Sequence, residues 1–285
     1  MIAIDWGTTS FRAYRLDREG NVVESRSSGK GIMATPPGPN VLEEEIGAWL
    51  DDGPIVMSGM VGSRQGWVEA PYVPCPAGFR EIASALREVH WKNHRAWIVP
   101  GVSCRDAAGV PDVMRGEETQ ILGCGVDGTI CLPGTHSKWV EVRGGRIERF
   151  STHMTGEVYA VLKQHSILGR MMEEGAPDRE AFAQGVRRSG DERGLLHHLF
   201  GVRTRGLMGE LAPAASASYL SGMLIGHELR GRAVKEVLLL GAPALTALYA
   251  EAAALRGVAT RTLDADAAVR CLFRLGRELP GPSRA

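Results

Sequence analysis

The chain begins with a short apolar segment that ends in polar, turn-forming residues. Residues 2–4 are apolar and lead into Asp5, Gly7-Thr8-Thr9-Ser10 follows, and a second strand-like segment starts at Phe11. This pattern predicts a strand hairpin. Its glycine lets the backbone approach an anion, its hydroxyls and amides can donate hydrogen bonds to phosphate, and Asp5 can hold a hydrated divalent cation. Many ordinary hairpins share the pattern, so this one stretch does not establish a phosphate site.

The same pattern recurs once, much later in the chain. Apolar residues 129–132 precede Gly134-Thr135-His136-Ser137, which aligns without a gap to Gly7-Thr8-Thr9-Ser10, and a strand and a glycine turn follow. The repeat predicts two similar halves that face each other across a cleft. Leu132 stands where the first copy has Asp5, so only the first hairpin offers a carboxylate. This asymmetry favours a metal bound to phosphate from one side.

Around the two hairpins, the hydrophobic pattern predicts strands that alternate with helices. Strands are expected near 54–57, 96–102 and 237–240, and helices near 41–50, 79–89, 150–162, 177–188, 194–200, 214–230, 245–256 and 265–277. In the helix at 214–230, Ser218, Gly222 and Gly226 recur every four residues, a spacing that permits close approach of another helix or a ligand. We predict two domains, 1–125 and 126–285.

Composition excludes several classes of protein. With 285 residues, 44% of them hydrophobic, the chain can bury two ordinary cores. Lys plus Arg equals Asp plus Glu at 33 each, so no overall field attracts nucleic acid or an anionic membrane. Five cysteines without C-x-x-C spacing argue against a disulfide framework or a zinc site. We found no signal peptide or membrane span in the pattern, and therefore expect a cytoplasmic protein.

The order of these elements resembles the superfamily of sugar kinases, actin and heat-shock ATPases. Asp5-Trp6-Gly7-Thr8-Thr9 matches its first phosphate loop, Gly134-Thr135-His136-Ser137 its second, and Leu240-Gly241-Ala242 its adenosine loop. Each motif alone is common, but three in this order are more specific. The resemblance implies an α/β fold of two ribonuclease-H-like domains, each a mixed five-stranded sheet flanked by helices, that form an ATP clamp.

Longer strings of residues are similar to the 2-dehydro-3-deoxygalactonokinase family. They are Ser58-Gly59-Met60-Val61-Gly62-Ser63, Leu132-Pro133-Gly134-Thr135-His136-Ser137-Lys138-Trp139, Met154-Thr155-Gly156-Glu157, His165-Ser166-Ile167-Leu168-Gly169-Arg170 and Tyr219-Leu220-Ser221-Gly222. The resemblance covers essentially the whole chain. It implies transfer of phosphate from ATP to the terminal (6-) hydroxyl of 2-dehydro-3-deoxy-D-galactonate in galactonate catabolism.

The resemblance also implies which residues bind ATP and Mg²⁺. Asp5 would hold Mg²⁺ through water. The residues expected at the nucleotide are Gly7, Thr8, Thr9, Ser10, Gly134, Thr135, His136, Ser137, Lys138, Gly241 and Ala242. Lys138 has the alternative of a strand residue whose ammonium extends to solvent.

The catalytic base is predicted among three acidic residues. Arg115-Gly116-Glu117-Glu118 is similar to the glycine and paired glutamates of exopolyphosphatases in the same superfamily, where a carboxylate orients water or metal. Sugar kinases more often use an Asp in this region, and Asp112 is the candidate for that role. We favour Glu117 and leave Glu118 with the alternative of facing solvent.

The sugar acid needs a cation for its carboxylate. Arg64 is the best candidate, because it lies among glycines in the loop after a predicted strand and can bind a carboxylate in bidentate fashion. The other residues expected at the substrate are Gln65, Trp67, Tyr72, Thr155 and Glu157. Trp67 has the alternative of a core residue, Thr155 of a helix N-cap and Glu157 of a first-turn residue favoured by the helix dipole.

Two other functions stay open at this point. The chain could phosphorylate another 2-keto-3-deoxy sugar acid, or it could be a non-metabolic ATPase of the actin or heat-shock type that acts on a protein partner. We expect a small sugar acid and ATP as its partners, without nucleic acid or membrane, and the sequence leaves a homodimer open.

Overall fold

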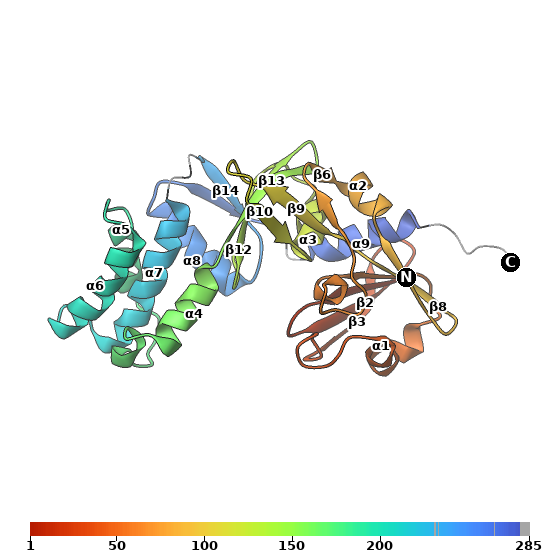
Figure 1. Cartoon of the computed structure of the whole chain (residues 1–285), viewed down its shortest axis with the longest axis horizontal. Helices are drawn as coiled ribbons and strands as arrows, with labels where there is room; N and C mark the ends of the chain where they lie inside the picture. The colour runs from red at the N-terminus through yellow and green to blue at the C-terminus, as the bar shows by residue number, and fades with distance from the viewer. Residues whose placement is uncertain (231, 233, 265, 280–285) are drawn as a thin grey trace. The chain divides into compact units, whose positions relative to one another are not determined.

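The computed structural model describes residues 1–230, 232, 234–264 and 266–279 (Figure 1). They pack as two compact units. Unit 1 comprises Met1–Gly128, Val140–Phe150 and the segment from Asp264 onward, and unit 2 comprises Thr129–Trp139 and Ser151–Leu263. The sequence-based division into 1–125 and 126–285 stays a prediction.

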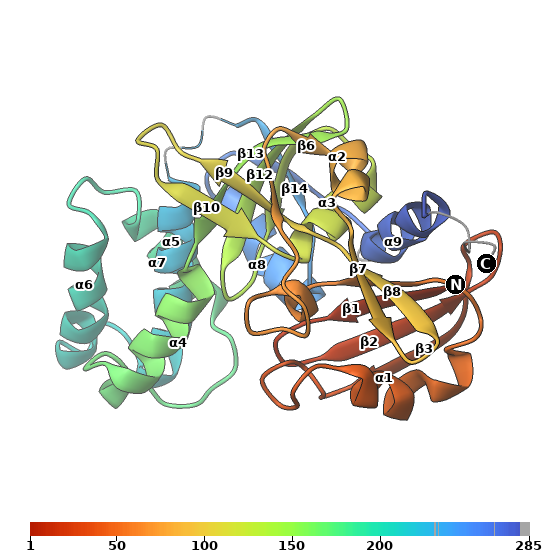
Figure 2. The same ribbon diagram turned by 45° about the vertical axis from the view of Figure 1, so that its right-hand side comes forward.

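Unit 1 is built on a six-stranded sheet in the order β3-β2-β1-β4-β8-β7 (Figure 2). Its strands are β1 (Ile2–Trp6), β2 (Phe11–Leu16), β3 (Val22–Ser28), β4 (Ile55–Ser58), β7 (Arg87–Trp91) and β8 (His94–Ile98). The first three strands are antiparallel neighbours, whereas β1, β4 and β8 run parallel. The carboxyl ends of β1 and β4 therefore lie side by side.

Helices cover both faces of this sheet. Successive strand residues point to opposite faces, and in β1 both faces carry apolar residues that need to be buried. Ile2 and Ile4 belong to a core cluster that also contains residues of α1 (Pro39–Ile46). On the other face, α9 (Ala267–Arg277) packs against β1 and β4, and α3 (Glu117–Cys124) packs against α9. A buried sheet with this alternation positions the strand ends rigidly.

Shorter elements complete unit 1. A three-stranded sheet has the order β10-β9-β5, with β5 (Tyr72–Pro74), β9 (Gly101–Arg105) and β10 (Pro111–Met114). Strand β6 (Ala77–Gly78) precedes helix α2 (Phe79–Ser84). Four short 3-10 helices among the described residues are η1 (Gly47–Trp49), η2 (Met60–Gly62), η3 (Gly169–Met171) and η4 (Pro213–Ala215).

The third sheet repeats the strand order of the first. Its order is β15-β14-β11-β12-β13-β6, and its further strands are β11 (Gly128–Leu132), β12 (Ser137–Arg143), β13 (Arg146–His153), β14 (Glu236–Leu239) and β15 (Ala259–Thr262). Strands β11, β14 and β15 run parallel, as β1, β4 and β8 do. Read from β13 to β15, this order corresponds strand for strand to β3-β2-β1-β4-β8.

The repeated order confirms the predicted α/β class with two related halves. One detail of that prediction is wrong, because each of the two large sheets has six strands instead of five. The extra edge strands are β7, which pairs with β8, and β6, which pairs with β13. The boundary between the two units falls within β12 and β13.

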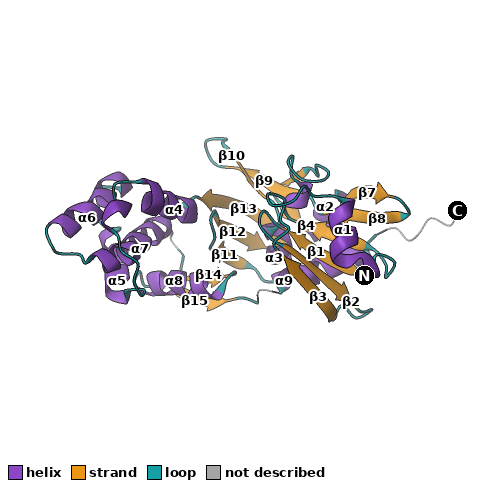
Figure 3. Cartoon of the chain, turned by 90° about the horizontal axis from the view of Figure 1, so that it is seen from below, coloured by secondary structure: helices purple, strands orange, loops and turns teal. Residues whose placement is uncertain are grey.

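Unit 2 is rich in α-helices (Figure 3). They are α4 (Thr155–His165), α5 (Arg179–Arg188), α6 (Leu195–Leu207), α7 (Ser216–Leu229) and α8 (Pro243–Ala254). Helices α5 and α7 approach closely at glycines: a side chain at Gly222 would overlap the Phe182 carbonyl, and one at Gly185 would overlap that of Tyr219. Of the small residues spaced along α7, Gly222 is therefore explained by the packing of α7 against α5.

Three local predictions were wrong in part. The helix predicted near 150–162 begins only at Thr155, because residues up to His153 continue strand β13. The predicted helix 79–89 ends at Ser84, and β7 follows, because Val89 and Trp91 alternate with exposed residues and are buried in the sheet. The predicted strand 96–102 is two strands, β8 and β9, separated at Pro100, which has no amide proton to donate. Within the described residues, no helix is both long and apolar enough to cross a membrane.

The close α5–α7 contact predicts the effect of one methyl group. Gly222→Ala should lower the unfolding free energy by about 1–3 kcal/mol, because the new side chain meets backbone that cannot move away cheaply. Gly201→Ala in α6 is the matched control: nothing lies within 4 Å of its added methyl, so stability should stay unchanged or rise by up to about 1 kcal/mol. Thermal unfolding followed by circular dichroism measures both, and equal effects would contradict the packing argument.

Candidate active site

The first hairpin turn presents two hydroxyl side chains on the surface. The Gly7 amide donates to the Ser10 carbonyl at 2.9 Å, which closes a turn with Thr8 and Thr9 at its tip. Both threonines are exposed. The segment that contains Gly31 packs against the backbone of this turn. A side chain at residue 31 would overlap Thr8 and Thr9, so this contact requires glycine. The turn thus holds Thr8 and Thr9 where phosphate oxygens can reach them.

Asp5 lies at the carboxyl end of β1, where two glycines bring other backbone segments close. Gly59 follows β4 with a φ of 97°, and a Cβ there would lie 2.7 Å from the Trp6 carbonyl oxygen and 3.4 Å from Asp5 Oδ1. Gly116, at the start of α3, has a φ of 108°, and its Cβ would lie 3.3 Å from the Gly59 Cα. Both positions require glycine for conformation and for space. The ends of β1 and β4 and the start of α3 therefore converge beside Asp5.

The paired glutamates accept hydrogen bonds from backbone just before α3. Glu117 Oε2 accepts from the Arg115 amide at 3.0 Å, and Glu118 Oε2 accepts from the Gly116 amide at 2.7 Å. The alternative that Glu118 faces solvent is wrong, because its side chain is fully buried. Burial, and next the neighbouring Glu117 carboxylate, raise the pKa of Glu118 to about 8.

Electrostatics connects Glu117 to Asp5. Burial raises the pKa of Asp5, the Arg12 guanidinium at 3.4 Å counteracts this rise, and Glu117 adds to it. The structure thus brings the predicted metal ligand and the favoured base candidate together in unit 1. Asp112, the other base candidate, lies on β10 opposite Cys104, where it is one of the groups that raise the pKa of that thiol after burial.

The donor set at Asp5 can be compared with the needs of Mg²⁺. Within the described ranges, no three His, Cys, Asp or Glu side chains are grouped so that they could hold a metal ion. Mg²⁺ at nucleotide sites is commonly held by one or two carboxylates together with waters and phosphate oxygens. A single partly exposed carboxylate beside the turn that carries Thr8 and Thr9 fits that mode, and it does not fit a cage made of protein ligands alone.

The loop after β4 places its predicted substrate residues in different environments. The Arg64 side chain is 89% exposed, with Nε 3.9 Å from Glu69 Oε1, and Gln65 is also exposed. Trp67 packs against the core and meets Trp91 edge-on, with ring centroids 5.4 Å apart. Arg64 and Gln65 are accessible to a ligand, whereas Trp67 is largely a core residue.

Arg115 is a residue whose importance the sequence did not reveal. It is 8% exposed, its Nη2 donates to the Ala70 carbonyl at 2.8 Å, and its guanidinium lies 4.3 Å from the ring centroid of Tyr72. Its Nε and Nη1 are buried without a hydrogen-bond partner among the described residues. Arg115 lies two residues before the start of α3, so its contacts with Ala70 and Tyr72 tie the segment after β4 to the helix that begins with Glu117. The only sequence signal was its place in the quoted Arg-Gly-Glu-Glu string.

The second phosphate loop is supported by the start of α4. The Glu157 amide donates to the Thr135 carbonyl at 3.0 Å, and His136 Nε2 lies 2.5 Å from Glu157 Oε2. Thr135 and His136 are exposed. Lys138 is only 5% exposed, and its ammonium donates to the His136 carbonyl at 3.2 Å, so the alternative that it extends to solvent is wrong. Its ammonium adds positive charge to the base of this loop.

Two hydroxyls predicted at ligands point instead into the interior of unit 2. Ser137 is fully buried, and its Oγ lies 2.8 Å from the Tyr249 hydroxyl. Thr155 donates its hydroxyl proton to Glu228. The alternative of Thr155 as a helix N-cap is also wrong, since Met154 occupies that position. Leu132, the counterpart of Asp5, is buried and apolar.

The predicted adenosine loop lies beside the second phosphate loop. Strand β14 pairs in parallel with β11, so both loops leave the same edge of the sheet. Gly241 has a φ of 148°, and a Cβ there would lie 3.5 Å from the Pro133 carbonyl oxygen. Ala242 is the N-cap of α8, and Pro243 follows at its first position.

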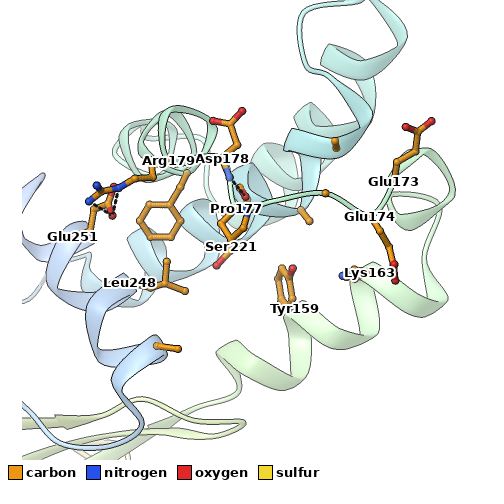
Figure 4. Close-up of a pocket in the computed structure, with 16 residues that line it drawn as sticks. Tyr159, Lys163, Glu173, Glu174, Pro177, Asp178, Arg179, Ser221, Leu248 and Glu251 are labelled. Carbon is orange, nitrogen blue, oxygen red and sulfur yellow. Dashed lines mark hydrogen bonds and ion pairs between the residues drawn. The ribbon is translucent and has the colours of Figure 1, made fainter.

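A cavity of about 500 Å³ opens among the helices of unit 2. Its lining includes Tyr159, Lys163, Ser218, Ser221, Leu248 and Glu251 (Figure 4). Arg179 Nη2 lies 3.1 Å from Glu251 Oε2 on one side, and the Asp178 amide donates to Ser218 Oγ at 3.0 Å on another. Ala244, in the first turn of α8, also lines it, so the adenosine loop leads directly into the cavity wall. An apolar wall with several polar groups suits a nucleoside-sized ligand.

Sequence comparisons place this geometry among known proteins. The family described as 2-keto-3-deoxy-galactonokinase matches residues 5–275. A probable 2-dehydro-3-deoxygalactonokinase of Rhizobium meliloti is 38% identical over 286 aligned positions, which cover 94% of this chain and 93% of the relative. The 2-dehydro-3-deoxygalactonokinase of Escherichia coli is 35% identical, with 96% of each chain covered.

Solved structures agree with these sequence matches. A probable 2-dehydro-3-deoxygalactonokinase from Sinorhizobium meliloti superposes with a TM-score of 0.87 at 36% identity, covering 96% of this chain and 97% of that one. The activator of 2-hydroxyisocaproyl-CoA dehydratase from Clostridium difficile gives a TM-score of 0.50 at 12% identity, covering 98% and 94%. At that identity the likeness shows the fold alone.

The burial of Glu118 predicts a dependence of stability on pH. A raised carboxyl pKa means that the folded state binds the proton more tightly than the unfolded state, whose pKa is about 4.5. The wild type should therefore lose stability as the pH rises from about 4.5 to about 8, by an amount on the order of 3 kcal/mol at pH 7.

Glu118→Gln removes this titration and keeps an acceptor for the Gly116 amide. The melting temperature of the variant relative to wild type should therefore increase from pH 5 to pH 8. A constant difference across this range in thermal unfolding would contradict the assigned environment of Glu118.

Proposed function

The chain belongs to the 2-keto-3-deoxy-galactonokinase family, and from this membership we propose that it transfers the terminal phosphoryl group of ATP to the 6-hydroxyl of 2-dehydro-3-deoxy-D-galactonate, in galactonate catabolism. It is an ATP-dependent sugar-acid kinase. The observation that carries the proposal is the identity of 35–38% to kinases of this name over nearly the full length. The matching strand orders and their two Gly-Thr loops support it independently.

Phosphoryl transfer depends mainly on positioning and on neutralising charge. We assign the terminal phosphates of ATP to the hydroxyls and backbone of Thr8 and Thr9 and to the loop around Thr135 and His136, all of which are exposed. Asp5 would hold Mg²⁺ through water, and the ion would offset phosphate charge when bound. Ser137 contributes its backbone only, because its hydroxyl is buried against Tyr249.

Glu117 is the residue we propose to orient the attacking hydroxyl. Its charge contributes to the raised pKa of Asp5, so the two carboxylates are close enough to interact, whereas Asp112 lies on the separate small sheet. Its carboxylate is fixed by the Arg115 amide, so it does not need to be ordered by the substrate. Proton transfer occurs late in such reactions, so an ordinary carboxylate can serve if its position is right.

Arg64 is the residue we propose to bind the substrate carboxylate. Its exposed guanidinium can form two parallel hydrogen bonds to a planar carboxylate, and its contact to Glu69 is too long to occupy it. Gln65, exposed beside it, can bind a hydroxyl. Tyr72, held under the Arg115 guanidinium, offers a fixed aromatic surface to the carbon chain of the substrate.

The nucleoside of ATP is proposed to occupy the cavity of unit 2. The cavity is large enough for it, and its wall begins two residues after the adenosine loop, at Ala244. Ser218 and Ser221 offer hydroxyls, and Leu248 offers an apolar surface for the base.

The activity is tested by ADP release coupled to NADH oxidation, with a panel of 2-keto-3-deoxy sugar acids. Turnover should depend strongly on 2-dehydro-3-deoxy-D-galactonate. Higher kcat/KM with another acid of the panel would change the substrate assignment, and ATP turnover unaffected by every acid would reject the kinase.

Asp5→Asn should lower kcat in this assay by about 100-fold or more, because it removes the charge that we assign to the metal ion. The fold should persist, since Asn is isosteric and the burial of Asp5 already disfavours its charged form. Normal activity with Mg²⁺ in this variant would remove Asp5 from the mechanism. Circular dichroism provides the control for folding.

Filling the cavity should affect one substrate only. Ala217 on α7 lines it, so Ala217→Phe should raise KM for ATP by about 10-fold and leave KM for the sugar acid unchanged. A melting temperature near that of wild type shows that the variant is intact. An unchanged KM for ATP in a folded variant would place the nucleoside elsewhere.

A further inference from the structure

A buried carboxylate joins four elements of unit 2 behind the second phosphate loop. Glu228 of α7 is 5% exposed. Its Oε1 accepts from Trp139 Nε1 at 2.6 Å, its Oε2 accepts from the Tyr249 hydroxyl at 2.7 Å, and the Thr155 hydroxyl donates to Oε2 as well. A buried charge is costly unless several donors satisfy it, and three donors converge on this one.

The direction of these hydrogen bonds follows from the chemistry of the groups. An ionised carboxylate only accepts, so the Tyr249 hydroxyl must give its proton to Glu228. Burial, and next the Glu228 charge, raise the pKa of Tyr249 well above its usual range, so the proton stays on the phenol. The Tyr249 oxygen then accepts from Ser137 Oγ at 2.8 Å. A directed chain therefore runs from Ser137 through Tyr249 to Glu228.

Each member of this network belongs to an element that we have placed at the nucleotide. Ser137 ends the second phosphate loop, and Thr155 begins α4, whose Glu157 amide supports that loop. Tyr249 follows the cavity residue Leu248 on α8, and Glu228 lies on the helix that gives Ser218 and Ser221 to the cavity. The carboxylate thus connects the phosphate loop to the walls of the nucleoside cavity.

We propose that Glu228 is a positioning residue for phosphoryl transfer, which fixes the second phosphate loop relative to the nucleoside cavity through Tyr249, Thr155 and Trp139. This inference rests on the proposed kinase function. Glu228 does not touch the reacting atoms; it sets where the loop holds them. Displacements of about 1 Å in such a loop can lower a rate about 100-fold.

The test compares Glu228→Gln with Tyr249→Phe. Glutamine keeps the volume but brings an amide group that can only donate, so one of the three donors loses its acceptor. Both variants should lower kcat about 10- to 100-fold and change KM for the sugar acid less than about 3-fold. Because they interrupt one chain, the double variant should be no slower than the slower single variant.

Ser189→Ala is the matched control. Ser189 is also fully buried in unit 2 and hydrogen-bonded, to the Val186 carbonyl and to Arg256, but it touches neither the loop nor the cavity. It should lower the melting temperature and leave kcat unchanged. The proposal would be overturned if Glu228→Gln and Tyr249→Phe behaved like Ser189→Ala, with a lower melting temperature but a normal kcat.

The wild-type assay separates this proposal from the proposed function. If the wild type phosphorylates none of the acids, the kinase assignment fails, and the network is then tested by the affinity for a non-hydrolysable ATP analogue. Glu228→Gln should weaken that affinity about 10-fold, whereas Ser189→Ala should not. If Glu228→Gln does not fold, Tyr249→Phe, which removes one oxygen atom, gives the same test. A wild-type kcat together with a wild-type affinity for the ATP analogue in Tyr249→Phe would overturn the proposal.

Discussion

The parallel pairing of β1 with β4 in unit 1, and of β11 with β14 in the third sheet, is the constraint on which the candidate site residues of each unit depend. Parallel neighbours end at the same edge of a sheet, so the loops that follow them are adjacent without any contact of their own. In unit 1 this places Asp5 next to the loop that begins at Gly59. In unit 2 it places Gly241 next to Pro133. Candidate ligand-binding groups far apart in sequence are therefore brought together, within each unit, by backbone pairing.

Glycines allow backbone segments to approach each other closely at these loops. The reason that glycine is needed differs from one position to the next. Gly59 and Gly116 adopt positive φ angles and also lie too close to other backbone for a Cβ. Gly31 and Gly156 have ordinary φ angles, but each lies directly under a phosphate loop, where a side chain would overlap the turn above. Gly222 has nothing to do with a loop and serves the contact of two helices. Only the first four lie at the candidate site, although all five look alike in the sequence.

Local patterns predicted the two hairpins, most helices and the candidate loops, since these depend on neighbours in sequence. The pattern failed where tertiary pairing decided the outcome, as in β7, whose strand character depends on its partner β8. The side-chain directions of the site also escaped prediction. Ser137 and Thr155 looked like ligand hydroxyls, but their partners, Tyr249 and Glu228 respectively, each lie more than seventy residues away along the chain. Arg115 likewise gains its role from Tyr72 and Ala70, which no local pattern connects to it.

The difference between Asp5 and Leu132 has a structural counterpart in how each loop is supported. Asp5 is a partly exposed carboxylate whose charge burial disfavours, a state that a bound cation relieves. Leu132 is apolar and buried, so the second loop has no charge of its own at that position. It rests instead on the buried Glu228, whose carboxylate accepts hydrogen bonds from three donors. We infer that the two hairpins differ in how they use a carboxylate. In the first, Asp5 is available to bind an ion, whereas in the second, Glu228 from another helix fixes the conformation of the loop.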